Sequence, residues 1–95
     1  MFLKDFLSEI VYNQIIDNYE DEYLSNIDKN NFFQVLEMFK KYDFYFIEDI
    51  ILNHLDIFTM DSNDVETKIL ELKDRLGDDF VSIIGNDLRY LTQIV

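Results

Sequence analysis

The chain of 95 residues contains no cysteine and no proline, and it has a single histidine. Without cysteine it can form no disulfide, no thiolate zinc site and no Cys nucleophile, and this absence fits a reducing compartment. Charges interrupt every apolar run before it could span a membrane, and Asp5 lies where a signal peptide would have its apolar stretch. We therefore expect a cytoplasmic protein that has no cofactor and no contact with membranes.

Basic residues are also scarce, since 8 Lys and Arg face 20 Asp and Glu, and the formal net charge is −12. A chain this acidic repels nucleic acid and anionic lipid, so we expect no direct nucleic-acid binding and a basic protein as the partner. The net charge is −5 over residues 1–30, −3 over 31–60 and −4 over 61–95. The acid is thus spread over the chain and does not form a disordered tail.

Hydrophobic residues make up 48% of the chain and aromatic residues 16%, enough for one folded domain over residues 1–95. Apolar side chains recur at helical spacing in several segments. The sequence predicts an all-α, compact bundle of about four to six short helices. The main segments are 2–19, 31–41, 43–58 and a helix that starts near Asp61 and stops at Gly77, followed by two short helices.

Helix boundaries are predicted from capping residues and glycines. Asp43 is the predicted cap of the third helix, although the composition of residues 44–47 also allows a short extended segment. Asp78 or Asp79 is expected to cap the helix after Gly77. Gly85 is predicted to stop that helix before the last one begins.

His54 is the one residue that suggests acid–base catalysis. It shares a predicted helical face with Ile47, Ile51 and Phe58, and the nearest acid in the sequence, Asp56, points elsewhere. A catalytic histidine needs a partner group, so we expect His54 to be half-buried and bonded to a backbone carbonyl. We predict no enzymatic activity and a structural role for His54.

Two segments resemble the start of a calcium-binding loop. In the segment that begins at Asp61, Glu66 occupies the position where the turn needs glycine, and Leu72 stands in place of the bidentate glutamate. The segment from Asp28 has Phe33 at the glycine position. We interpret these clusters as a helix cap and a polar turn, and we predict no metal site.

Tyrosine beside acid is favourable at protein interfaces, because a rigid ring provides buried area and its polar tip tolerates water. The densest such patch comprises Tyr19, Glu20, Asp21, Glu22 and Tyr23, and it is the first candidate for partner binding. Its structural alternative is an ordinary amphipathic helix end. The second candidate is a set of acids around the glycines, namely Asp78, Asp79 and Asp87.

Some of these acids have a spacing that could imitate nucleic acid. Carboxylates four residues apart on a helix are separated by about 6 Å along its axis, which resembles the distance between successive phosphates. Asp17 with Asp21, and Asp74 with Asp78, have this spacing. The alternative is an acidic surface that only keeps the protein soluble.

Together these features favour a non-enzymatic protein-binding module. The most specific hypothesis is a small acidic inhibitor that masks a basic surface on a nucleic-acid-processing protein. In size and charge the chain is similar to bacterial immunity proteins against nuclease toxins and to phage-encoded inhibitors of host defence, by analogy alone. The alternative is a homo-oligomeric structural or scaffold subunit, such as a homodimer, that hides its aromatic residues in a self-interface.

Overall fold

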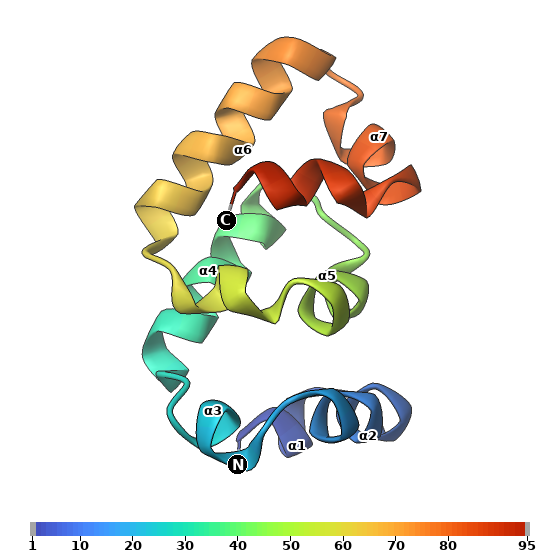
Figure 1. Ribbon diagram of the computed structural model, residues 1–95. Coiled ribbons are helices and arrows are strands. Elements are labelled where there is room, and N and C mark those ends of the chain that lie inside the picture. The colour runs from blue at the N-terminus through green and yellow to red at the C-terminus, as the bar shows by residue number, and fades with distance from the viewer. Residues whose placement is uncertain (1, 95) are drawn as a thin grey trace.

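A computed structural model describes residues 2–94, and all regular structure in this range is helical (Figure 1). Five α-helices have seven residues or more, which confirms the predicted all-α bundle. The elements in chain order are α1 (Phe2–Phe6), α2 (Glu9–Asn18), α3 (Asp21–Ser25), α4 (Lys29–Lys41), α5 (Ile47–Asn53), the 3-10 helix η1 (Leu55–Thr59), α6 (Ser62–Leu76), α7 (Phe80–Asn86) and the 3-10 helix η2 (Leu88–Gln93).

The prediction of one helix over residues 2–19 is wrong, because the chain breaks between α1 and α2. Ser8 has extended backbone angles, and its Oγ accepts a hydrogen bond from the Val11 amide at 3.4 Å, which caps α2. The Ser8 amide in turn donates to Glu48 Oε2 on α5 at 3.1 Å. A contact with a residue distant in sequence therefore accompanies the break.

The prediction that Asp43 caps the third helix is also wrong, because Asp43 terminates α4. It has φ of 64°, and its amide donates to the Lys40 carbonyl while the Phe44 amide donates to that of Phe39. This pattern is a Schellman motif, in which Phe44 also packs edge-on against Phe39, with ring centroids 5.1 Å apart. Residues 44–46 then form an irregular link without the short extended strand that the composition allowed.

The helix predicted over residues 43–58 is divided into α5 and η1. His54 lies between them with φ of −140° and ψ of 49°. His54 and Phe58 consequently do not share one helical face, as the sequence pattern suggested. The second predicted helix begins earlier than expected, at Lys29, because Asp28 caps it by accepting from the Asn31 amide at 2.9 Å.

The sequence anticipated α6 closely. Asp61 caps it, and Gly77 ends it with φ of 86°, as predicted. Gly85 does not stop a helix as expected, because it lies within α7. Asp79 is at the start of α7, but its side chain forms no capping hydrogen bond there, whereas Asp87 caps η2 by accepting from the Arg89 amide at 3.1 Å.

One hydrophobic cluster, to which every helical element contributes, forms the core. At its centre Phe58 packs against Phe32 and Phe39, with ring centroids 4.8 and 5.6 Å apart. Six of the nine phenylalanines are buried and none of the six tyrosines is. No polar or charged residue among residues 2–94 is buried.

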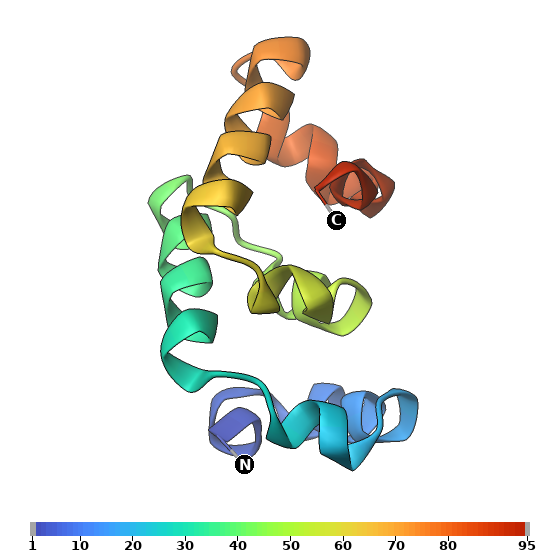
Figure 2. The same cartoon turned by 60° about the vertical axis from the view of Figure 1, so that its left-hand side comes forward.

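The helices are arranged along an elongated body of 38 × 24 × 20 Å (Figure 2). Helices α1 to α3 form one end, α4 and α6 continue along one side, and α7 with η2 lies at the other end. Helix α2 packs against α5, and α4 packs against η1 and α6. None of the helices in the described range has both the length and the apolar character needed to cross a bilayer.

Candidate protein-binding surface

The fold separates the charges of the chain. No Lys or Arg occurs between Lys4 and Lys29 or between Lys41 and Lys68, and each of these two segments contains seven acids. Because α2 packs against α5, the two base-free segments lie side by side. We define the acidic face by the exposed carboxylates on and between α2, α3, α5 and η1, namely Glu9, Asp17, Glu20, Asp21, Glu22, Glu48, Asp49 and Asp56.

The predicted patch at residues 19–23 lies on this face. Tyr19 and Tyr23 are both half-buried and stack with ring centroids 5.5 Å apart and an interplanar angle of 17°. Burial raises the pKa of both phenols, and the negative charge of Asp56 raises it further. A hydrogen bond with the Leu55 backbone opposes the rise in Tyr19, and one with the Thr59 side chain opposes it in Tyr23. The tyrosine pair thus rests against η1 and close to Asp56.

The three acids between the tyrosines are exposed at the start of α3. The chain turns there, because Tyr19 ends α2 in an extended conformation and Glu20 is the N-cap residue of α3. Asp21 and Glu22 lie in the first helical turn, where negative charge interacts favourably with the helix dipole. Local stabilisation and partner binding are therefore compatible uses of the same carboxylates.

Asp56 is the member of this site that sequence reasoning missed. It lies in η1, far along the chain from the tyrosine pair, and no local motif connects the two. A usable signal was present in the sequence, because Asp56 belongs to the second segment without Lys or Arg. Where two such segments pack together, their acids come close to one another.

The acid pairs proposed to imitate phosphates do not have the predicted geometry. Helix α2 ends at Asn18, between Asp17 and Asp21, and α6 ends at Leu76, between Asp74 and Asp78. Neither pair therefore lies on one helix. The axial spacing of about 6 Å expected for positions four apart in a helix does not apply to them.

The second predicted set of acids is only partly brought together. Asp78 and Asp79 are exposed at the turn between α6 and α7, whereas Asp87 lies beyond the other end of α7, about 10 Å away along the helix axis. Asp87 also accepts two hydrogen bonds from the Arg89 guanidinium, both 2.8 Å long, which hold the pKa of its carboxyl below the usual range. Its charge is thereby compensated locally.

The basic residues collect on α4 and α6, which carry six of the eight. Lys40 pairs with Glu37 at 3.9 Å, Lys41 with Glu66 at 2.9 Å and Lys68 with Glu71 at 3.8 Å. With the pair of Arg89 and Asp87, only four of the twenty acids take part in an ion pair among residues 2–94. The charge of the acidic face is left uncompensated by the protein.

His54 lies away from any cluster of possible metal ligands, since the described part of the chain contains no group of three or more His, Asp or Glu side chains that could hold an ion. The residue is half-buried at the junction of α5 and η1. Its backbone amide donates to the Ile50 carbonyl at 2.7 Å, and its carbonyl accepts from Ile57 at 3.0 Å. The structural role of its side chain stays a prediction.

No protein-family model, curated protein or solved structure matches this chain. No function is therefore transferred to this chain from a known protein. The acidic face itself, with its tyrosine pair, is the feature on which a function can be proposed.

Proposed function

We propose that this chain is a non-enzymatic protein-binding module, a small acidic inhibitor that masks a basic surface on another protein. The observation that supports this most strongly is the packing of α2 against α5, which brings two base-free segments together and places eight of the twenty acids on the acidic face. Such a surface attracts a basic partner and orients it during approach. The stacked pair of Tyr19 and Tyr23 supplies aromatic area for the contact.

The segregation of charge favours binding over mere solubility. A surface that only keeps a protein soluble works best with both signs interspersed. Here six of the eight cations lie on α4 and α6. At the edges of the acidic face, Lys4 shares a pocket with Glu9, and Lys40 shares a groove with Glu48 and Asp49. Like charges held close together repel one another, so this arrangement costs stability unless a partner neutralises it.

The basic groove of a nuclease or another nucleic-acid-processing protein is the kind of target that this charge suits. Masking requires only that negative potential covers the positive groove. A stricter form, in which helical carboxylates reproduce the spacing of phosphates, lost its geometric basis when Asp17 and Asp21 were found on different elements. The proposal is therefore electrostatic masking.

Self-assembly, the alternative function, has weaker support. It rested on a surplus of aromatic residues, but Tyr45 is the only one of the fifteen aromatic side chains that is exposed. The other large apolar side chains at the surface are Ile10 and Ile16 on α2 and Leu70 on α6. Joining two copies through the acidic face would bring like charges together, which is unfavourable.

Affinity capture from an extract of the native host tests the proposal. Three baits are compared at low and high salt, namely the parent and two variants. The first variant, the face triple, combines Glu20→Gln, Asp21→Asn and Glu22→Gln. The second, the corner triple, combines Asp74→Asn, Asp78→Asn and Asp79→Asn. Both triples remove three exposed charges, at opposite ends of the molecule. We expect the parent and the corner triple to retain a basic protein at low salt and the face triple to lose it.

Three results would contradict the proposal. The first is that no basic protein is captured, and the second is that capture is unaffected by salt. The third is equal capture by the face triple and the parent. If instead only the corner triple loses the partner, the binding surface is the second acidic set around Asp78 and Asp79.

A further inference from the structure

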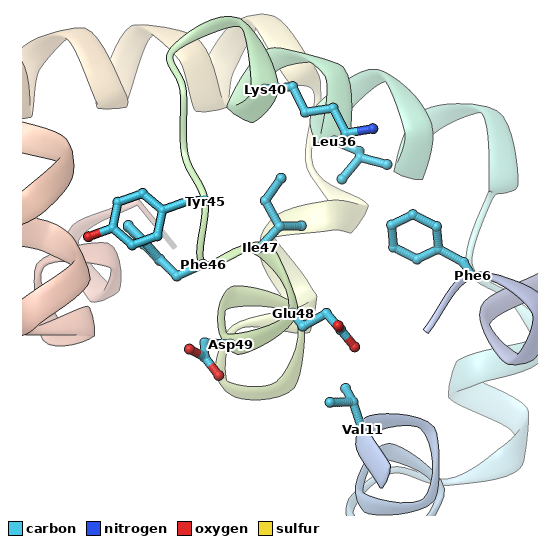
Figure 3. Close-up of a pocket in the computed structure, with 9 residues that line it drawn as sticks. All are labelled: Phe6, Val11, Leu36, Lys40, Tyr45, Phe46, Ile47, Glu48 and Asp49. Atoms are coloured by element: carbon cyan, nitrogen blue, oxygen red, sulfur yellow. The ribbon is translucent and has the colours of Figure 1, made fainter. Parts of the chain in front are cut away.

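A groove opens beside the acidic face, between α1, α2, α4 and α5 (Figure 3). Its volume is about 460 Å³, within the range of sites that hold small ligands or side chains. The walls around its centre are apolar, and the side chains come from four helices. These residues are Phe6 on α1, Val11 on α2, Leu36 on α4 and Ile47 on α5.

The edges of the groove are charged. Glu48 and Asp49, both exposed, lie in the first turn of α5, and Glu48 also accepts the hydrogen bond from the Ser8 amide that joins α5 to the start of α2. Lys40 on α4 lies at the opposite edge, where its own partner is Glu37 at 3.9 Å. The groove therefore combines an apolar interior with an acidic edge that continues into the acidic face.

We propose that the groove binds an apolar side chain of a basic partner segment, with a neighbouring Lys or Arg of that segment paired to Glu48 and Asp49. This inference rests on the proposed function and specifies how the partner is anchored. Burying an apolar side chain in the groove supplies the contact energy that steering charges alone do not. The segment is oriented with its cation on the α5 side, because Lys40 repels a cation on the other side.

Charge complementarity argues against other occupants. An anionic ligand would meet Glu48 and Asp49 at the edge and the other carboxylates of the acidic face beyond them. A second copy of the chain would bring another net charge of −12 to the same surface. A segment with both an apolar and a basic side chain can fill the apolar interior and pair with the acidic edge at the same time.

Two synthetic peptides of equal charge test the proposal, an amphipathic peptide of Lys and Leu and a matched peptide in which Ser replaces each Leu. Binding to the isotopically labelled protein is followed by amide NMR shifts at low salt. We expect the Leu peptide to bind more tightly and to shift the amides of Val11 and Ile47. The Ser peptide should bind weakly and leave both amides unchanged.

Variants at the groove sharpen the result. Val11→Phe fills the groove, and we expect it to weaken binding of the Leu peptide by roughly tenfold or more, because the apolar side chain of the peptide can then no longer be buried there. Glu48→Gln with Asp49→Asn should weaken binding of the Leu peptide, whereas Lys40→Gln should leave it unchanged or tighten it. These three polar substitutions lie at the surface, so they test the site even if Val11→Phe fails to fold.

The outcomes separate this inference from the proposed function. If both peptides bind alike and the groove variants have no effect, while the face triple still weakens binding, the groove proposal is wrong and the acidic face stands. If neither peptide binds at low salt, both are wrong. If the Leu peptide binds but shifts only the amides of Tyr19 to Tyr23, the anchor lies at the tyrosine pair and the groove proposal is overturned.

Discussion

Gly85 is needed for a tertiary contact that the neighbouring sequence does not reveal. A Cβ atom placed on it would lie 2.8 Å from Phe46 Cε1 and 3.0 Å from Phe46 Cδ1. The glycine is therefore required by the close approach of a buried ring from the link between α4 and α5. From the sequence alone it looked like a helix stop, because its packing partner is distant along the chain.

Gly85→Ala should lower the free energy of unfolding by about 1 kcal/mol, because overpacking outweighs the gain in helix propensity. Gly77→Ala should also destabilise, by about 1–3 kcal/mol, but through its φ of 86° alone, since nothing lies within 4 Å. Urea unfolding with Phe46→Leu added to each variant distinguishes the causes. We expect Phe46→Leu to lower the free energy of unfolding less in the Gly85→Ala protein than in the parent. In the Gly77→Ala protein it should lower this free energy by as much as in the parent. A Gly85→Ala protein as stable as the parent would contradict the packing account.

Glu66 ties α6 to the end of α4. Its Oε2 accepts from Tyr42 Oη at 2.5 Å and from Lys41 Nζ at 2.9 Å, and these bonds, that of Tyr42 foremost, hold the pKa of Glu66 below its ordinary value. A carboxyl with a lowered folded-state pKa stabilises the fold above its unfolded pKa. That stabilisation is lost as the pH falls through the folded value.

Glu66→Gln should therefore lower the melting temperature at pH 7, and the difference from the parent should shrink as the pH falls below the ordinary glutamate pKa of about 4.3 and through the lowered folded pKa. Glu71→Gln is the matched control on the same helix, because Glu71 is more exposed and pairs with Lys68 only at 3.8 Å. Thermal unfolding followed by circular dichroism across pH measures both variants. A difference for Glu66→Gln that persists unchanged at pH 3 would show that the carboxylate charge is not involved.

At the scale of elements, α6 is stabilised by the N-cap residue Asp61, which could be identified from the sequence. Asp61 Oδ1 accepts from the Asn63 amide at 2.8 Å, whereas Asp64 lies in the first turn without a capping bond. Asp61→Ala should cost about 1 kcal/mol, which lowers the melting temperature by roughly 4–8 °C in a domain of this size. Asp64→Ala removes the same charge nearby and should cost clearly less. Equal losses would mean that the helix dipole, and not the cap, accounts for the effect.

The elements that the sequence predicted well are those set by local signals. Helix α6 has a capping aspartate, an apolar stripe and a terminal glycine in one continuous segment, and all three act where they were expected. The breaks at Ser8 and His54 were missed because the apolar period continues through them. At Ser8 a tertiary hydrogen bond to Glu48 coincides with the break, and periodicity does not contain that information.

For the candidate site, too, the sequence predicted the part that is set by local signals and missed the part that depends on packing. The cluster at residues 19–23 could be identified because its tyrosines and acids are adjacent in the sequence. Its position next to Asp56, and the groove beside α5, depend on the packing of α2 against α5, which a single sequence does not reveal. The separation of Asp87 from Asp78 and Asp79 likewise follows from α7, which lies between them.

At the scale of the whole molecule, charge repulsion should limit stability. Sixteen of the twenty acids take part in no ion pair within residues 2–94, and salt screens the repulsion among exposed charges. We expect moderate NaCl to raise the melting temperature. The face triple should gain less in melting temperature from added NaCl than the parent does. A clear fall in melting temperature with salt would mean that the specific ion pairs outweigh the net repulsion.

The central claim is that the acidic face binds a basic partner, and the association rate of that partner tests it most directly. The rate is measured by stopped flow against ionic strength, for the parent, the face triple and the corner triple. We predict a steep fall with salt for the parent, because attraction between the surfaces is screened over about 8 Å at physiological ionic strength. The face triple should associate more slowly at low salt and depend less on salt than the corner triple. An association rate for the face triple equal to that of the parent at low salt would contradict the account.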